Sequence, residues 1–370
     1  MYPYWILFLV FALGTIQTRS GTLAAAHGGV GLPAAPQRLL LGVAVVLMAL
    51  MIGFRYEVGG DWLTYLWMYD DIQHMSLFAS LTRTDPGYGV LNWISSELGT
   101  DIWGVNLVCG ALFCFGLFRF AKGQPHPWLA ILVGVPYLVI GVGMGYTRQA
   151  VAIGLAMCGF AAIAQGSLPR FLFWVLLAAT FHRTAVVLIP IVGLAFSRNR
   201  LQTLLLSGLA VVVGYFVLLA PAMDQFTRGY IDQVYEAQGA GIRLAMNLVP
   251  AVLFLLLSKK LAPEPSERAV WRNVSIVALG AYVGYFFVAS TVIVDRLALY
   301  VIPLQLFVLS RLPSAFAVKG LPSRGMLMLV IAYCAAVQFV WLNFSNHSIY
   351  WIPYKVYPVI SGPDAASSRY

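Results

Sequence analysis

A dense polar cluster follows directly after the apolar run of residues 39–54. It extends from Arg55 to Tyr65 and reads Arg-Tyr-Glu-Val-Gly-Gly-Asp-Trp-Leu-Thr-Tyr. The apolar run has the character of a membrane-spanning helix, and charged groups at the exit of such a helix usually mark a site. Asp61 lies six residues after Arg55. A carboxylate close to an arginine and to a membrane surface can be held ionised, which suits a general base or a ligand for sugar hydroxyls.

Arg148 interrupts a stretch, residues 127–165, that is otherwise free of charge. Gly141, Gly143 and Gly145 precede it and would permit a break in the helix. The next helix would then begin with its N-terminal dipole facing an anion. The alternative is a tight extracellular hairpin whose arginine extends to lipid head groups.

Two further pairs of polar residues lie between apolar segments. His182 and Arg183 are adjacent, and two such groups at one membrane turn are costly without partners, although a lone histidine can be satisfied at a helix end. Asp295 and Arg296 could form a local ion pair that pins a turn. With Arg296 at the start of a helix and Tyr300 four residues later on the same face, an oxyanion-binding role also fits.

The absent motifs narrow the chemistry. The sequence has no phosphate loop, dinucleotide fingerprint, metalloprotease histidine pair or nucleophile elbow, and its four cysteines lack metal-ligand spacing. We therefore expect no cofactor and no metal. Several arginines with few acids suggest a phosphate or diphosphate ligand, and aromatic residues interleaved with carboxylates suggest carbohydrate. A lipid-linked sugar would supply both.

The composition identifies the elements that must position these residues. Of 370 residues, 60% are hydrophobic and 10% are charged, whereas soluble domains average roughly 25% charged. We predict an all-α, polytopic membrane bundle, because helices satisfy their backbone hydrogen bonds in lipid. The apolar segments lie near 3–18, 39–54, 102–121, 128–145, 148–165, 168–181, 184–197, 201–222, 244–258, 273–293, 297–310 and 325–343. This predicts 10–12 crossings in a single domain, residues 1–345, followed by a tail, residues 346–370.

The charges of the loops predict the orientation of the bundle. If the N-terminus is outside, fourteen of the 23 Lys and Arg residues fall in inside loops together with only two acids, Glu264 and Glu267. The outside loops then hold nine basic residues and twelve acids. This is the distribution that the positive-inside rule requires. It also accounts for the net charge of +9, so we expect no nucleic-acid partner.

Two outside loops are long enough to carry a site. The first, residues 55–101, is rich in aromatics and predicts helices lying at the interface. The second, residues 223–243, ends in glycines that suggest a mobile flap. The ionisable residues expected on the outer side, and predicted to converge on one external pocket, are Arg55, Asp61, Asp85, Arg148, His182, Arg183, Arg228, Arg243 and Arg296.

These residues resemble the motifs of a known family. The matching positions are Arg55-Tyr56, Val58-Gly59, Asp61-Trp62, Tyr65, Asp85-Pro86-Gly87-Tyr88, Arg148-Gln149, Ala152, Phe181-His182, Thr184-Ala185, Arg296, Tyr300 and Pro353-Tyr354-Lys355. Their order is similar to that of the EpsG family of Wzy-like polymerases, which build exopolysaccharide and O-antigen chains. The chain departs from the family pattern at Trp62, Asp85 and Thr184, where tyrosine, glutamate and serine are usual, and each substitution keeps the chemistry of its position.

The resemblance implies a glycosyltransferase-type polymerase in the bacterial inner membrane. Its substrate would be an oligosaccharide repeat unit linked to undecaprenyl diphosphate, its site would face the periplasm, and a chain-length regulator and a flippase of the same pathway would be partners. Arg148 and Arg296 would neutralise charge on the leaving diphosphate, and Asp61 or His182 would be the base. The expected substrate-binding residues are Arg55, Tyr65, Asp85, Gln149, Arg183, Arg228, Arg243 and Tyr300.

Three other functions compete with this interpretation. A polyprenyl-phosphate-sugar-dependent glycosyltransferase would use similar groups but add one sugar at a time. A membrane acyltransferase fits less well, because His182 is expected outside whereas acyl donors such as coenzyme A are inside. A transporter of lipid-linked glycans would need polar groups near the bilayer midplane and on both sides.

Overall fold

The computed structural model describes residues 1–26, 34–196, 199, 201–202, 205, 208, 212, 239–287 and 291–357. The described residues form helices and no strand; the two isolated bridges join Arg55 to Val356 and Val318 to Leu321. This confirms the predicted all-α class. Among the described residues, five helices are long and apolar enough to cross a membrane, and five shorter apolar helical stretches accompany them. The chain is therefore a multi-pass membrane protein.

The helices follow the predicted apolar segments closely. The elements that make up the bundle are α1 (Tyr2–Ala26), α2 (Ala34–Gly53), α6 (Asp101–Ala121), α7 (Pro127–Gly134), η1 (Val135–Gly143), α8 (Thr147–Ile163), α9 (Leu168–Phe181), η2 (Arg183–Val187), α10 (Leu188–Gly193), η3 (Leu194–Phe196), α13 (Ala240–Leu261), α14 (Pro265–Gly284), α15 (Thr291–Ala298), η5 (Leu299–Val301), α16 (Pro303–Ala315) and α17 (Arg324–Phe344). The predicted segment 201–222 lies largely outside the described residues.

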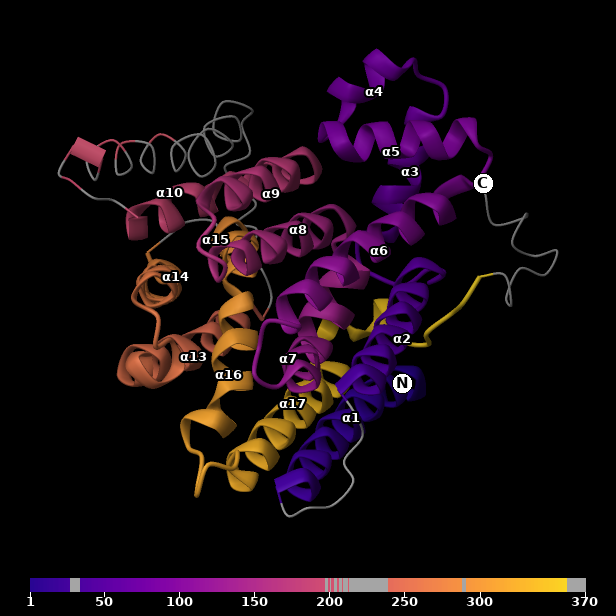
Figure 1. Cartoon of the computed structure of the whole chain (residues 1–370). Coiled ribbons are helices and arrows are strands. Elements are labelled where there is room, and N and C mark those ends of the chain that lie inside the picture. Colours follow the sequence, from indigo (N-terminus) through magenta and orange to yellow (C-terminus); the bar gives the residue numbers. More distant parts are fainter. Residues whose placement is uncertain are drawn as a thin grey trace.

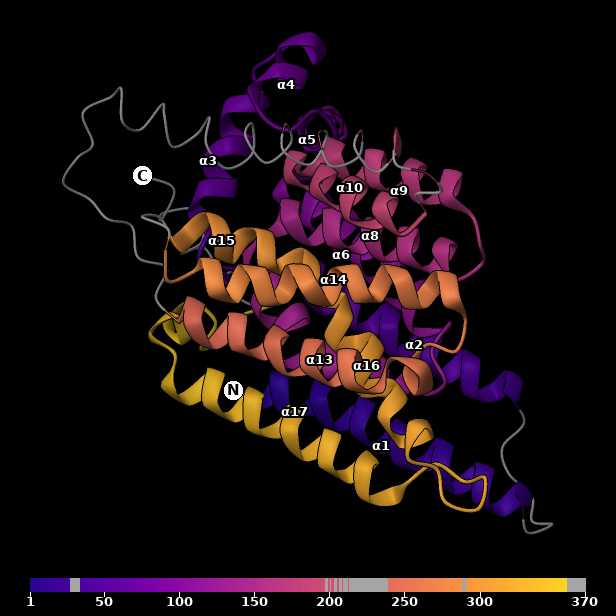
Figure 2. The same ribbon diagram turned by 90° about the vertical axis from the view of Figure 1, so that its left-hand side faces the viewer.

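Helix α8 forms the centre of the bundle. It packs against α6 and α9, and most of its side chains are buried. Figure 2 shows α8, α9, α13 and α14 running nearly parallel. Helices α6 and α8 approach closely at Gly116, where a Cβ atom would lie 1.8 Å from the carbonyl oxygen of Gly154. Small residues at such a crossing let two membrane helices pack backbone to backbone.

The segment before α8 contains the predicted helix break. Residues 135–143 wind as a π-helix, and Tyr146 leaves the helical region with φ −123° and ψ 65°. Gly141, Gly143 and Gly145 lie in or beside this break, as expected. Since π-helical turns are rare and often occur at functional sites, the start of α8 is a natural place to look for one.

Three short helices cover one end of α6. They are α3 (Trp62–Ile72), α4 (Leu77–Arg83) and α5 (Pro86–Glu97), and they form the predicted helical part of the loop of residues 55–101. Figure 1 shows the three grouped together beyond the end of the bundle. The exposed Trp67 and Phe78 belong to this group. Such aromatic side chains suit the head-group region of a bilayer.

The residues after α17 pack back onto the bundle. Following η6 (Asn346–Tyr350), Trp351 is buried and donates its indole N–H to the carbonyl of Ile140 over 2.7 Å, while its own carbonyl accepts from the Tyr4 hydroxyl over 2.6 Å. The Tyr350 carbonyl accepts from the N–H of Gly59 over 2.9 Å. The described part of the predicted tail, residues 346–357, thus fastens the N-terminal helix, the π-helix and the polar loop together.

Candidate functional site

Arg148 lies in the first turn of α8 and reaches towards the start of α5. Its Nη1 donates to the Thr84 hydroxyl over 3.0 Å and to Asp85 Oδ2 over 2.8 Å. Asp85 precedes Pro86 at the N-terminus of α5, and its side chain makes no capping hydrogen bond there. The carboxylate is therefore available to other segments: Oδ1 accepts the backbone N–H of Arg183 over 3.2 Å. Asp85 thus links α8 to the turn after α9.

His182 occupies that turn. Its φ of −156° and ψ of 106° end α9, and the 3-10 turn η2 follows. The imidazole Nδ1 lies 2.6 Å from the Thr184 hydroxyl, and this hydroxyl donates to the Tyr300 hydroxyl over 3.2 Å. A short hydrogen-bonded chain therefore runs from His182 into the core, because Tyr300 is buried.

Arg296 and Asp61 face each other across the cluster. Arg296 Nη2 lies 3.8 Å from Asp61 Oδ2, and its guanidinium carbon lies 3.8 Å from the ring centroid of Tyr146, a cation–π arrangement. The two charged side chains are 34% and 36% exposed, so a ligand can reach both. Gln149 Nε2 donates to the Arg296 carbonyl over 2.5 Å and leaves its own buried Oε1 without a partner.

The position of Arg296 differs from the prediction. The residue lies in the last turn of α15, not at the start of a helix, and η5 follows before α16 begins. The sequence contains an uninterrupted apolar run after Arg296, which concealed this change of helix type. The guanidinium therefore gains its position from Tyr146 and Asp61, and no helix N-terminus contributes there.

The side chains described above form one cluster. The charges that act on Asp61 are those of Arg296 and Arg148, and the charges that act on His182 are those of Asp85, Arg148, Arg296 and Arg183. Tyr65 is buried beside Arg148 and Asp61. The start of α3, the start of α5, the start of α8, the turn after α9 and the end of α15 meet here. A site built from five separate segments agrees with the prediction that distant residues converge.

Gly59 allows the polar loop to reach this cluster. Its φ is +110°, and a Cβ atom would lie 2.3 Å from the carbonyl oxygen of Met144, beside the break before α8. Only glycine combines such a φ with so close an approach. The contact places Asp61, two residues later, opposite Arg296.

Three of the predicted site residues that the structure describes lie differently from the rest, namely Arg55, Arg243 and Arg183. Arg55 is 1% exposed and donates to the Ile52 carbonyl over 2.6 Å, to Thr147 Oγ1 over 2.8 Å and to Asn106 Oδ1 over 3.2 Å, which braces α2 and α6 beneath the start of α8. Arg243, in α13, forms a two-point ion pair with Asp295 at 2.7 and 2.9 Å. Arg183 has an exposed side chain, and Arg228 lies outside the described residues.

The ion pair of Arg243 identifies the partner of Asp295, which the sequence did not determine. Asp295 is 5% exposed and pairs with Arg243, which lies 52 positions away, instead of with its neighbour Arg296. Arg296 is consequently available to the cluster. The charges of Arg243 and Asp295 act on Tyr146, so this pair borders the cluster.

The electrostatic environment shifts the two candidate bases in opposite directions. Burial raises the pKa of Asp61 above its usual value, and the nearby Arg296 and Arg148 oppose that rise. Burial lowers the pKa of His182 to about 4; Asp85 opposes this change, while Arg148, Arg296 and Arg183 add to it. The imidazole is therefore neutral at pH 7.

Two residues of the cluster, Thr84 and Tyr146, were missed from the sequence. Each lies within two positions of a residue that was singled out, and each contacts a charged group. Closeness in the chain to a charged residue was the available signal. Tyr88 and Thr184 were named only as motif positions; Tyr88 is buried beneath Arg148, whose guanidinium carbon lies 6.0 Å from its ring centroid.

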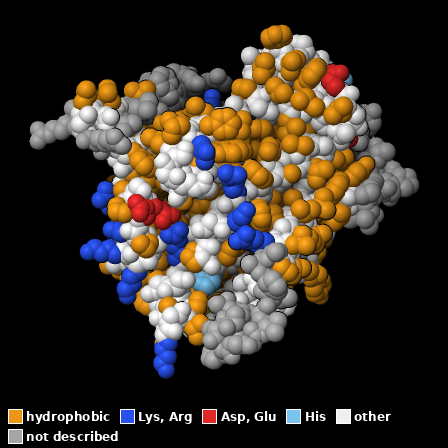
Figure 3. All heavy atoms as spheres, viewed as in Figure 1, with side chains coloured by type: hydrophobic (Ala, Val, Ile, Leu, Met, Phe, Trp, Pro, Cys, Tyr) orange, Lys and Arg blue, Asp and Glu red, His pale blue; other side chains and the backbone are white. Residues whose placement is uncertain are grey.

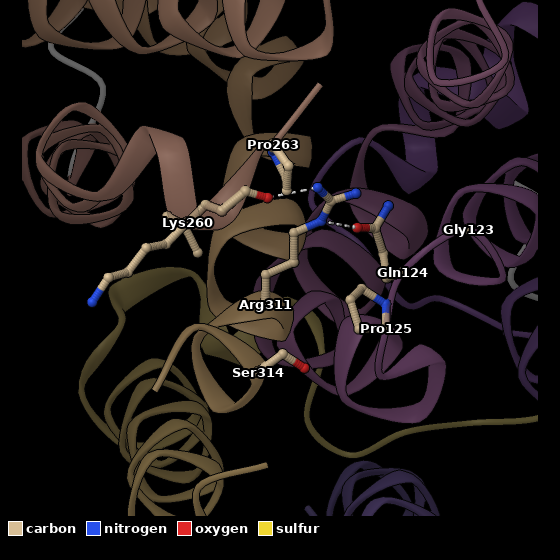
Figure 4. Close-up of a pocket in the computed structure, with 8 residues that line it drawn as sticks. Gly123, Gln124, Pro125, Lys260, Pro263, Arg311 and Ser314 are labelled. Carbon is tan, nitrogen blue, oxygen red and sulfur yellow. Dashed lines mark hydrogen bonds between the residues drawn. The ribbon is translucent and has the colours of Figure 1, made fainter. Parts of the chain in front are cut away.

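A hollow lies at the end of the bundle opposite the polar cluster. It has a volume of about 380 Å³ and is lined by Gln124, Lys260, Arg311 and Ser314 among others (Figure 4). Arg311 is bound there to Gln124 at 2.9 Å, to the Leu261 carbonyl at 2.7 Å and to Glu267 at 3.1 Å. Along α13, Arg243 and Lys260 are about 26 Å apart at 1.5 Å per residue, which is close to the thickness of a bilayer core. The hollow is therefore separate from the polar cluster.

The fold and the cluster together define a polytopic helical membrane protein with an arginine-rich polar site at one end of the bundle. The model of the EpsG family matches residues 38–356, and the chain belongs to this family. No curated protein and no solved structure matches the chain. Membership supports a role as a membrane polysaccharide polymerase of glycosyltransferase type. Across the described residues, no group of three or more His, Cys, Asp or Glu side chains could hold a metal ion.

Proposed function

We propose that the protein polymerises oligosaccharide repeat units carried on undecaprenyl diphosphate, at the periplasmic face of the bacterial inner membrane. The observation that carries the proposal is the approach of Arg148 and Arg296 to one partly exposed cluster that also holds Asp61 and His182. The two guanidinium groups can stabilise the leaving diphosphate, and the carboxylate or the imidazole can accept the proton of the attacking hydroxyl.

The reaction would place each group in a defined role. A hydroxyl oxygen of the incoming repeat unit attacks the anomeric carbon of the growing chain, and the bond between that carbon and the phosphate oxygen breaks. The electron pair leaves with undecaprenyl diphosphate, whose charge Arg148 and Arg296 stabilise. Asp61 or His182 takes the hydroxyl proton.

The surroundings of the cluster fit a lipid-linked saccharide. Tyr146 offers aromatic surface beside the charged groups, and Asp85 offers an oxygen acceptor near Arg148. Tyr65 and Gln149 line the cluster from within, because both are buried. Helices α3 and α4 expose the aromatic side chains Trp67 and Phe78, which suit the head-group region from which a lipid diphosphate would enter the site. In this arrangement Arg55 supports the site from below, Arg243 borders it, and Arg183 and Arg228 are candidates for binding the saccharide. A flippase would bring the lipid-linked units to this face before the step, and a chain-length regulator would act on the growing chain.

The length distribution of the product tests the proposal. The purified protein in lipid nanodiscs, given undecaprenyl-diphosphate-linked repeat units, should produce a ladder of chains that differ by whole repeats. A single addition would instead identify a one-step glycosyltransferase. Movement of the substrate across the bilayer without any new glycosidic bond would identify a transporter, and either result would contradict polymerisation.

A further inference from the structure

We propose that Thr184 and Tyr300 fix the tautomer of His182, so that its Nε2 is the atom that accepts the proton of the attacking hydroxyl. This inference rests on the proposed function and selects the base that the proposal leaves open. His182 would be the catalytic residue, and Thr184 and Tyr300 would be positioning residues. The hydrogens in the bonds between His182, Thr184 and Tyr300 determine which imidazole nitrogen is protonated.

The hydrogen bonds around Thr184 leave one arrangement for a neutral imidazole. A threonine hydroxyl has a single hydrogen. The Thr184 hydroxyl donates this hydrogen to the Tyr300 hydroxyl over 3.2 Å, and it lies 2.6 Å from His182 Nδ1. The hydrogen between Thr184 and His182 must therefore come from the imidazole. With Nδ1 protonated, the lone pair of the neutral ring lies on Nε2.

Nε2 is also the available nitrogen of the ring. Among the described residues it has no hydrogen-bond partner, whereas Nδ1 is held by Thr184. The charged groups that face the ring are Asp85 from the start of α5, Arg148 from α8, Arg296 from α15 and the neighbouring Arg183. Three of these four are cations, which would attract the diphosphate of the donor and bring the reacting bond next to the imidazole.

Asp61 is arranged for a different purpose. Its Oδ2 lies 3.8 Å from Arg296, the guanidinium that a leaving diphosphate needs. Asp61 therefore acts as the charge partner of Arg296 when the diphosphate is absent. In that position the carboxylate competes with the leaving diphosphate for Arg296. It takes no part in the hydrogen bonds that join His182, Thr184 and Tyr300.

Binding of the substrate would strengthen His182 as a base. Burial and the three arginines lower the pKa of the free imidazole to about 4, so the ring is neutral and able to accept a proton at pH 7. A bound diphosphate brings negative charge that compensates the arginines, and this raises the pKa of His182. In the step itself, the bond between the hydroxyl oxygen and the anomeric carbon forms while the hydroxyl proton moves to Nε2. The bond from that carbon to the phosphate oxygen breaks, and its electron pair leaves with the lipid diphosphate. The resulting imidazolium then releases its proton to solvent.

Nitrogen-15 NMR of the histidine side chains tests the tautomer directly. The full chain, labelled with 15N-histidine in nanodiscs, is compared with Thr184→Val, Thr184→Ser and Tyr300→Phe, and the signal of His182 is identified by its loss in His182→Gln. At pH 7 we expect protonated Nδ1 and unprotonated Nε2 in the unmodified chain and in Thr184→Ser. Thr184→Val and Tyr300→Phe should give a mixture of tautomers. Protonated Nε2 in the unmodified chain, or an unchanged tautomer in both variants, would overturn the inference.

Polymer synthesis provides the second measurement. Thr184→Val should lower kcat roughly tenfold or more with little change in KM, and Thr184→Ser should restore it, because only the hydroxyl matters. Thr180→Val is the matched control: its hydroxyl bonds only to the Leu177 carbonyl of α9, so its removal should leave kcat unchanged. Equal kcat in Thr184→Val and the unmodified chain would contradict the role of Thr184. If no polymer forms even with the unmodified chain, the proposed function fails, and the NMR result still decides the tautomer.

Discussion

Arg148 and Arg296 reach the same cluster but are held in different ways. Arg148 has a close carboxylate partner at 2.8 Å, whereas Arg296 rests on Tyr146 with a looser partner at 3.8 Å. We predict that Arg148→Ala and Arg296→Ala each lower polymer synthesis by a factor of ~100 or more, because each removes a stabilising charge from the leaving diphosphate. Both variants should remain in the membrane, which an immunoblot of membrane fractions measures beside a gel of the polymer.

A surface arginine of the same region supplies the control. Arg83 pairs with Asp71 on α4–α3, and both side chains are about half exposed. Exposed ion pairs contribute little to stability, so Arg83→Ala should leave polymer length and amount unchanged. Normal polymer in both Arg148→Ala and Arg296→Ala would remove these two residues from the site.

The buried negative charge of Asp61 should lower the free energy of unfolding at neutral pH. Because burial raises its pKa in the folded state, the folded state binds more protons than the unfolded state between the two pKa values. The contribution of Asp61 to the free energy of unfolding is therefore most favourable at low pH, and it falls as the pH rises through the raised pKa. We predict that Asp61→Asn melts at a higher temperature than the unmodified chain at pH 7, and that the difference shrinks as the pH falls towards 4.

Thermal unfolding in detergent at several pH values measures this difference. Asp70→Asn is the control, because Asp70 is exposed on the same helix and meets only Gln73, at 3.4 Å. A lower melting temperature for Asp61→Asn at pH 7 would show that the pairing with Arg296 outweighs the cost of burial.

Among the elements of the fold, the loop that begins at Arg55 can pack against the break before α8 only because residue 59 is glycine. Gly59→Ala would force a Cβ atom against the Met144 carbonyl and a side chain into a φ of +110°. We expect a loss of ~1–3 kcal/mol in stability and a strong loss of polymerisation, because the added Cβ atom would displace the break before α8 that positions Tyr146 and Arg148. Gly60→Ala is a close control, since its Cβ would meet only the Trp351 ring at 4.0 Å. Equal behaviour of the two variants, measured by thermal unfolding and polymer yield, would argue against the role of this contact.

The elements also show what the sequence could and could not predict. Apolar runs determine helices in lipid, so the segments were predictable, and the glycines at 141, 143 and 145 indicated the break before α8. The end of α15 was not predictable, because no glycine or proline separates Arg296 from η5. Pairing was the second difficulty. The partner of Asp295 lies 52 positions away in α13, and no local pattern encodes a contact between helices.

Burial was the third property that the sequence concealed. Arg55 begins a run of polar residues and looked like a group of the outer surface, yet it is 1% exposed and hydrogen-bonded to Ile52, Asn106 and Thr147. Two of these partners, Asn106 and Thr147, belong to other helices. The two terminal nitrogens of Arg55 bond to these acceptors, whereas its buried Nε has no partner among the described residues. An arginine bonded in this way braces a fold, and only the packing of α2, α6 and α8 together makes that visible.

At the scale of the whole molecule, the two ends of the bundle differ in chemistry. The end with the starts of α8 and α13 holds the cluster of Asp61, His182 and Arg296, while the other end holds the hollow around Lys260 and Arg311. Lys and Arg side chains outnumber Asp and Glu side chains on the face shown in Figure 3. Since basic residues retain loops on the cytoplasmic side during insertion, we predict that the cluster faces the periplasm.

Single cysteines introduced at the two ends test this orientation. Thr82 in α4 and Ala317 after α16 are exposed, and the four native cysteines are buried, so the unmodified chain is a background control. In spheroplasts, Thr82→Cys should react with a membrane-impermeant maleimide, and Ala317→Cys should react only after the membrane is permeabilised. The reverse pattern would place the cluster in the cytoplasm and would be incompatible with the proposed polymerisation at the outer face. Because the two positions lie at opposite ends of one helical bundle, a single labelling experiment decides between the two orientations.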